Sequence, residues 1–123
     1  MRRWQQFHTD DVISEVEVGN VGTRPQSLHD LVVRLDHRLD VAVRLFAQTH
    51  PVASTYLKRV DTRRLDYLKK LYCDALPETL ADELARVEYA AFVGAQMLWP
   101  DAEPDERLIY KDFFARAAHA LKR

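Results

Sequence analysis

Apolar residues recur at helical spacing through most of the chain, and the clearest pattern lies between Leu80 and Leu98. The charged residues in the first half of this segment lie off the apolar stripe, and between Tyr89 and Trp99 no charged residue occurs. A helix that is apolar on nearly every side must be covered all round. The pattern therefore predicts a core helix that also faces a second subunit. Its stripe comprises Leu80, Leu84, Val87, Ala91, Gly94 and Leu98.

Residues 28–46 carry the strongest amphipathic pattern of the chain, and Ser27 precedes them as the expected helix cap. We expect this helix to end near Thr49, because Pro51 disfavours helical geometry at the preceding His50. The apolar face is expected to carry Leu28, Leu31, Val32, Leu35, Leu39, Ala42, Val43 and Phe46.

Residues 2–18 predict a helix for which Thr9 is interpreted as the cap. Two aromatic residues, Trp4 and Phe7, come one turn earlier, and they either extend the same helix or pack against it as a staple. The glycines and proline of the segment 19–26 predict a loop after it. The apolar side of the helix is expected to carry Val12, Ile13 and Val16.

The middle of the chain predicts two helices separated at Asp61. Residues 52–60 are expected to form a short helix, which Asp61 breaks before capping the next one. Pro77 ends that second helix, ahead of the segment from Leu80. Its inner stripe is expected to carry Leu65, Leu68, Tyr72 and Ala75, with Leu71 beside them.

The last predicted helix begins after the Pro100–Pro104 loop, with Asp105 as its cap. Together these patterns predict one all-α domain over residues 1–123, with five to six helices. Its final two helices are expected to run antiparallel, since a short loop joins them. The broad apolar stripe of the last helix comprises Ile109, Tyr110, Phe113, Phe114, Ala117, Ala118 and Leu121.

Composition limits the partners that the chain can take. The net charge of −1 provides no basic excess for nucleic-acid phosphates or anionic lipid. Cys73 is the only cysteine, so no internal disulfide can form, and a reducing compartment such as the cytoplasm is expected. No apolar run reaches the ~18 residues of a membrane span.

The sequence offers little catalytic chemistry. His29 and His37 share a predicted helix but lie too far apart to bind one metal, so we interpret both as solvated. Cys73 is interpreted as a small packing residue. The chain also lacks the motifs of zinc proteases, serine hydrolases and phosphate-binding loops. We therefore expect no enzyme, no cofactor and no metal; the competing hypothesis of a small helical enzyme needs a buried acid or histidine in a cleft.

Aromatic residues suggest either a ligand cavity or a plain core. A buried tyrosine needs a partner for its hydroxyl, and several of them could line a cavity. Gln96 is the sharper clue, because an amide in an uncharged stretch must find a hydrogen bond. That bond could be to a ligand, a partner subunit or an ordered water. The aromatic residues on the helices around the core are Phe46, Tyr56, Tyr67, Tyr72, Tyr89 and Phe92.

The order of these helices resembles the C-terminal domain of the TetR family of transcriptional regulators. The resemblance spans nearly the whole chain, and Trp4 with Val12-Ile13 resembles the helix that follows the family's DNA-binding domain. The family's helix-turn-helix has no counterpart here, so we expect DNA binding only through that missing N-terminal domain. The residues that carry the resemblance are Pro51-Val52, Arg59-Val60-Asp61, Arg64-Leu65, Leu68 and Tyr89-Ala90-Ala91-Phe92-Val93-Gly94.

The resemblance implies a homodimer with an effector pocket. In the family, the last two helices of each subunit form a four-helix bundle and also bound the pocket, which here would suit a small hydrophobic or aromatic effector. An alternative is a stand-alone helical module that forms a heterodimer with a full-length regulator. The expected pocket residues are Phe46, Tyr67, Leu71, Tyr89, Phe92 and Gln96. The expected interface residues are Val93, Gly94, Met97, Tyr110, Phe113, Phe114, Ala117 and Leu121.

Overall fold

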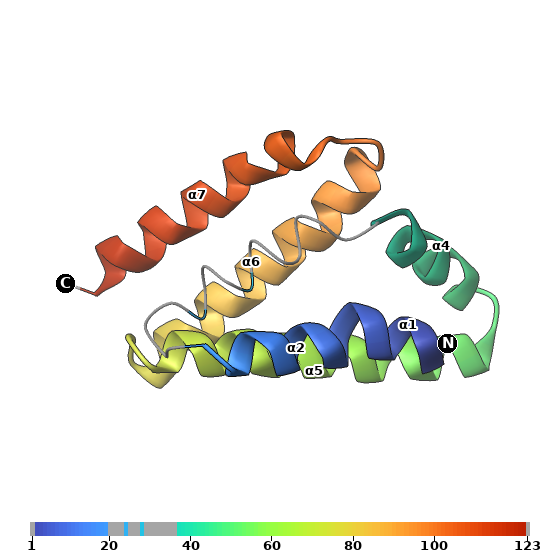
Figure 1. The fold of residues 1–123 in the computed structure, drawn as a ribbon, viewed down its shortest axis with the longest axis horizontal. Helices are drawn as coiled ribbons and strands as arrows, with labels where there is room; N and C mark the ends of the chain where they lie inside the picture. The colour runs from blue at the N-terminus through green and yellow to red at the C-terminus, as the bar shows by residue number, and fades with distance from the viewer. Residues whose placement is uncertain (1, 20–23, 25–27, 29–36, 123) are drawn as a thin grey trace.

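The computed structural model describes residues 2–19, 24, 28 and 37–122. These residues are helical apart from short turns, and no strand occurs among them, which confirms the all-α class. The loop expected over residues 19–26 and the start of the helix at Ser27 lie mostly outside the described residues. Figure 1 shows the resulting arrangement of helices.

The N-terminal helix is continuous, although its second turn is not an α-helix. The segments α1 (Arg2–Gln5), η1 (Gln6–Asp10) and α2 (Asp11–Glu17) follow one another without a break. The prediction of a helix here is confirmed, but Thr9 does not cap it. The backbone stays helical at Asp10, with φ −65° and ψ −44°, and η1 is a π-helical turn.

Helix α4 (His37–Ala47) ends where proline requires it to. Pro51 is the first residue of α5 (Pro51–Cys73), and His50 before it is extended, with φ −124° and ψ 106°. The predicted stop before Pro51 is thus confirmed. Helix α4 contacts both α5 and α6 (Glu78–Leu98).

The buried face of α4 differs from the predicted one. Leu39 and Phe46 are 45% and 50% exposed, whereas the polar His37 and Asp40 are each only 3% exposed. The helix therefore turns its polar stripe inward, with Val43 beside it. The reason is that charged groups on α5, neutral polar groups on α6 and the Trp4 indole supply partners for these polar side chains, as described below.

Helix α5 is a single helix of 23 residues, so the predicted break at Asp61 is wrong. A mid-helix aspartate weakens a helix when its carboxylate competes for backbone amides. The Asp61 carboxylate instead accepts hydrogen bonds from the side chains of Arg44 and Tyr89. The competing interaction is thereby removed, and the helix continues.

Helices α6 and α7 (Pro104–Leu121) form an antiparallel hairpin, as predicted (Figure 1). Pro77 directly precedes α6, and Trp99, the residue before Pro100, directly follows it. The two boundaries of α6 that proline marks in the sequence are therefore confirmed. The N-cap of α7 is Glu103, so Asp105 lies inside the first turn and is not the cap. Pro104 occupies the first helical position, which suits its fixed φ and missing N–H.

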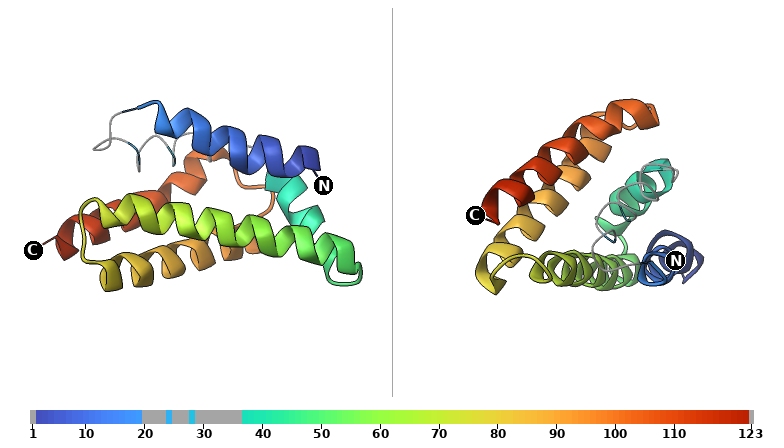
Figure 2. Two further views of the ribbon diagram at one scale, coloured as in Figure 1. Left: turned by 90° about the horizontal axis from the view of Figure 1, so that it is seen from below. Right: turned by 60° about the vertical axis from the view of Figure 1, so that its left-hand side comes forward.

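Helix α5 lies between the N-terminal helix and α6 in both views of Figure 2. Apolar side chains fill the two contacts. On one side Val16 of α2 packs with Tyr67 and Leu71 of α5, and on the other Leu68 of α5 packs with Leu84 of α6. Phe114 of α7 joins the α5–α6 cluster.

The buried stripe of α6 is only partly the predicted one. Leu84 is buried, but Val87 and Leu98 are 59% and 69% exposed. Glu88 is buried instead, and its carboxylate accepts a hydrogen bond from the Tyr72 hydroxyl. Hydrophobicity alone predicts that Val87 is buried, but Glu88 is buried instead, because the hydrogen bond from Tyr72 stabilises its carboxylate there.

Candidate functional site

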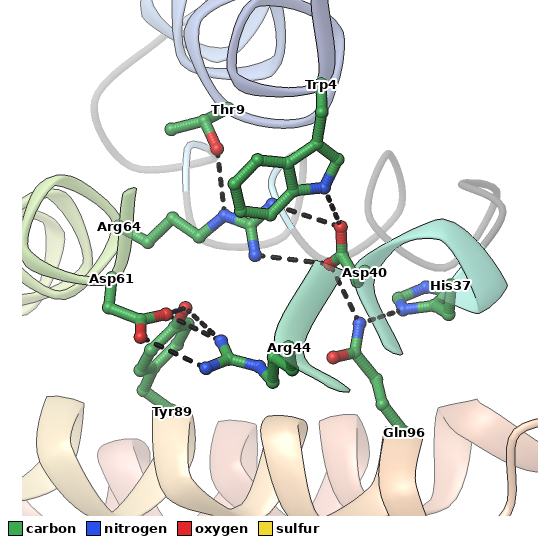
Figure 3. Close-up of polar contacts among 9 residues, drawn as sticks. All are labelled: Trp4, Thr9, His37, Asp40, Arg44, Asp61, Arg64, Tyr89 and Gln96. Atoms are coloured by element: carbon green, nitrogen blue, oxygen red, sulfur yellow. Dashed lines mark hydrogen bonds and ion pairs between the residues drawn. The ribbon is translucent and has the colours of Figure 1, made fainter. Parts of the chain in front are cut away.

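A buried carboxylate, Asp40 on α4, joins side chains from three other helices (Figure 3). The Trp4 indole Nε1 donates to Asp40 Oδ1 at 2.5 Å. Arg64 Nη1 on α5 and Gln96 Nε2 on α6 donate to Oδ2 at 3.2 and 3.0 Å. Asp40 is therefore the centre of a polar cluster that contains Trp4, Thr9, His37, Asp40, Arg44, Asp61, Arg64, Tyr89 and Gln96.

The π-helical turn brings the N-terminal helix into this cluster. Trp4 and Thr9 are five residues apart, and both are buried, with exposures of 4% and 2%. In a regular α-helix, residues five apart face different directions. Here the Asp11 N–H donates to the Gln6 carbonyl across the π turn, which brings the Trp4 and Thr9 side chains to the same side of the helix. As a result, the Thr9 hydroxyl can accept a hydrogen bond from Arg64 Nε at 2.9 Å.

Arg64 remains a cation although it is largely buried. Burial acts to lower its pKa, but the charge of Asp40 and its hydrogen bonds more than offset this effect, so the pKa is raised. The guanidinium also lies over the Trp4 ring, 5.3 Å from its centroid. The ion pair of Arg64 and Asp40 is thus a buried one, in which loss of either partner leaves an uncompensated charge.

A second group of the cluster consists of Arg44, Asp61 and Tyr89. Arg44 Nη1 and Nη2 contact the two Asp61 carboxylate oxygens at 3.0 and 2.6 Å, in a forked geometry. The Tyr89 hydroxyl donates to Asp61 Oδ1 at 2.5 Å and lies 3.1 Å from Arg44 Nη2. Burial raises the pKa of Tyr89 to about 12.

The raised pKa of Tyr89 predicts a loss of stability in alkaline solution. The folded state holds the phenolic proton more tightly than the unfolded state, so this contribution is complete below pH 10 and is lost between pH 10 and about pH 12. We expect the wild type to lose about 1 kcal/mol more than Tyr89→Phe between pH 9 and pH 11. Urea unfolding at both pH values measures the difference. Equal losses in the two proteins would contradict the prediction.

His37 and Gln96 complete the cluster next to an aromatic ring. Gln96 Nε2 lies 2.5 Å from His37 Nδ1, and the His37 ring packs edge-on against Phe92, with 5.3 Å between centroids. His37 is 3% exposed, so the interpretation of it as a solvated histidine is wrong. Because α4 turns its polar stripe inward, this ring faces Gln96 instead of water.

Two polar atoms of the cluster lack a hydrogen bond. Gln96 Oε1 and Arg44 Nε are both shielded from solvent, and neither has a partner in the structure. Most buried polar groups in folded proteins are paired, so each exception requires an explanation. The two atoms offer one acceptor and one donor to a small molecule or to water. Of the alternatives for the Gln96 amide, the structure thus satisfies the nitrogen internally and leaves the oxygen available.

The structure brings three of the six expected pocket residues together. Tyr89 and Gln96 belong to the cluster, and Phe92 contacts it through His37 and Tyr89. Phe46 lies apart, half exposed and stacked on His50 at 3.7 Å. The remaining two, Tyr67 and Leu71, pack against α2 on the other side of α5.

A signal for the missed residues was present in the sequence. His37, Asp40 and Arg44 are spaced three and four residues apart, which is a polar stripe with the helical period. Asp61 and Arg64 repeat the three-residue spacing on α5. Each stripe carries one acid and one arginine, so the two stripes can form two ion pairs with each other in a buried network. A search for apolar stripes alone places both of them on the outside.

The expected interface residues divide between the surface and the core. Phe113, Met97 and Leu121 are 57%, 42% and 41% exposed, whereas Phe114 is 5% exposed and lies in the core. Nothing is described for the Tyr110 side chain. The expected residues of intermediate exposure are Val93, Gly94 and Ala117.

Comparison with known proteins gives no match to a family model, a curated protein or a solved structure. Among the described residues, no group of three or more His, Cys, Asp or Glu side chains could hold a metal ion. Within the same residues, none of the helices has the length and apolar character needed to cross a membrane. Cys73 is exposed, so its interpretation as a packing residue is wrong.

Proposed function

We propose that this chain is the effector-binding and homodimerisation domain of a TetR-type transcriptional regulator, acting in the cytoplasm. Support comes from the order of the helices and from the terminal α6–α7 hairpin. The observation that carries the proposal is the buried polar cluster with its two unpaired atoms, Gln96 Oε1 and Arg44 Nε. Each unpaired buried atom costs about 1–3 kcal/mol, so a ligand that pairs with both atoms gains affinity from them.

The effector that suits this cluster is a small aromatic or hydrophobic molecule with at least one polar group. Its ring would pack against Phe92, and a donor group would pair with Gln96 Oε1. Asp40 links the N-terminal helix to α6, so a ligand that alters the position of Gln96 also alters the support of Trp4. Such a ligand regulates only if it binds one arrangement of the helices better than another.

Dimerisation in this proposal uses the α6–α7 hairpin. Apolar side chains on its surface include Met97, Trp99 and Phe113, with exposures of 42%, 63% and 57%. Exposed apolar residues grouped on one hairpin are typical of a protein interface. The same surface favours the second candidate function, a module that pairs with a different, full-length regulator. A homodimer in solution supports the first candidate, and a monomer supports the second.

Ligand binding is expected to raise thermal stability through Gln96. A library of small aromatic alcohols, amines and phenols, screened by thermal shift, should contain compounds that raise the Tm by about 10 °C at a hundredfold excess over Kd. Gln96→Met removes the amide oxygen that receives the ligand and should abolish the shift. The matched control is Gln48→Met, since Gln48 is exposed after α4. Shifts that persist in Gln96→Met would contradict the proposed pocket.

A further inference from the structure

A groove runs along the outer side of the contact between α2 and α5, away from the Asp40 cluster. Its volume is about 790 Å³, within the size range of small-molecule sites. The charged side chains that line it are Lys58, Arg59, Arg63, Lys70, Glu17 and Asp66. The lining is therefore basic, although the whole chain has a net charge of −1.

The positive charge of the groove is uncompensated at one end. Glu17 already pairs with Lys70, at 3.3 Å between Nζ and Oε1, and Arg63 pairs with Asp10 at 2.7 Å. Lys58 and Arg59 have no ion pair within the part of the chain that the structure describes. The Arg59 guanidinium lies over the Tyr56 ring, 5.8 Å from its centroid, which leaves its N–H edge available. An anionic group at this end would consequently meet two cations without displacing a carboxylate.

The lining of the groove also includes the hydroxyl group of a tyrosine. Tyr67 is 8% exposed, and its hydroxyl is shielded from solvent with no acceptor in hydrogen-bonding geometry. Burial raises the pKa of Tyr67, and so does the Glu17 carboxylate, which is close enough to attract the phenolic proton, so the hydroxyl keeps that proton. Ile13 lies beside it in the lining and supplies apolar surface. The groove thus combines two cations without an ion pair, an apolar wall and a hydroxyl donor that is shielded from solvent.

The distance between these features sets the shape of the occupant. Lys58 and Tyr67 are nine residues apart on one helix, which corresponds to about 13 Å at 1.5 Å per residue. We infer that the groove binds an elongated small organic anion, with its carboxylate or phosphate at Lys58 and Arg59. An oxygen at its far end accepts a hydrogen bond from Tyr67, and its apolar middle lies on Ile13. This site is separate from the proposed effector pocket and does not depend on it.

Titration of the ¹⁵N-labelled chain with 10-hydroxydecanoate tests the inference. The carboxylate and hydroxyl of this probe are separated by about the required length. We expect chemical-shift changes in residues 58–70 and 13–17, and at least tenfold tighter binding than for the neutral 1,10-decanediol. Equal affinity for acid and diol would overturn the inference. So would shift changes confined to the Asp40 cluster, which would instead support the effector pocket.

Matched variants separate the two features of the groove. The double variant Lys58→Gln, Arg59→Gln should weaken 10-hydroxydecanoate binding at least tenfold, and Lys69→Gln, Arg86→Gln, which removes the same charge outside the groove, should not. Tyr67→Phe should abolish the preference for 10-hydroxydecanoate over decanoate and leave decanoate affinity unchanged. An equal loss in both charge variants, or a preference that survives in Tyr67→Phe, would refute the assignment.

Discussion

Replacing Asp40 by alanine is expected to lower the free energy of unfolding by about 3–5 kcal/mol. The change leaves the Arg64 guanidinium buried without its counter-ion and removes the acceptor of the Trp4 indole. It also deprives the Gln96 amide of one acceptor. Since small domains are stable by only about 5–15 kcal/mol, the variant should lie close to unfolding at room temperature. Urea denaturation followed by circular dichroism measures the loss.

The control for Asp40→Ala is Asp10→Ala. Asp10 also pairs with an arginine of α5, Arg63, at 2.7 Å, but both side chains are 40% or more exposed. Exposed pairs contribute about 0–1 kcal/mol, so this variant should resemble the wild type. Asp40→Asn, which keeps an acceptor of the same shape, should fall between the two. If Asp40→Ala and Asp10→Ala lose the same small amount, the cluster does not support the fold as described.

The second large effect is expected at Phe113. In the wild type, light scattering at micromolar concentration should give the mass of a dimer, and Phe113→Glu should give that of a monomer. Phe113 is 57% exposed in the single chain, so a charge there costs the monomer little. In an interface core, the same change loses an aromatic contact and buries a carboxylate, which typically weakens association by 2 kcal/mol or more, or about thirtyfold.

Two further variants make the interface test specific. Val52→Glu introduces the same charge at another exposed apolar site, 71% exposed at the start of α5, and should leave the dimer intact. Gly94→Leu adds a side chain on α6 where a Cβ would meet nothing within 4 Å in the single chain. It should therefore retain the helical circular dichroism spectrum and weaken the dimer. A wild type that is monomeric, or a Phe113→Glu variant that stays dimeric, would exclude the hairpin interface.

The sequence was sufficient for those parts of the fold that depend on local chemistry. Helix boundaries lie near Pro51, Pro77 and Pro104. The proline ring restricts the backbone of the preceding residue, and proline has no N–H to donate to a helical hydrogen bond. The helical spacing of apolar residues predicts α6, and the short loop after it predicts the hairpin, because both signals lie within one continuous segment of the sequence. These features need no knowledge of which helices are neighbours.

The features that depend on neighbours were predicted less well. Leu39 and His37 belong to the same helix, and only the presence of Gln96 and Arg64 nearby makes burial of the polar side favourable. The sequence marks Asp61 as a helix breaker, because its partners Arg44 and Tyr89 are 17 and 28 residues away along the chain. The only indication of the π turn in the sequence is the five-residue spacing between Trp4 and Thr9.

The hydrogen bonds to Asp40 also constrain how the chain assembles. They join residues 24, 36 and 56 positions apart, so none of them can form within one helix, and only the bond from Arg64 joins two consecutive helices, α4 and α5. Each helix can appear early on its own local preferences, whereas this network forms only when the first turn, α4, α5 and α6 have all docked. Closure of the network is therefore a late event in folding, and it makes the turn that carries Trp4 an integral part of the domain.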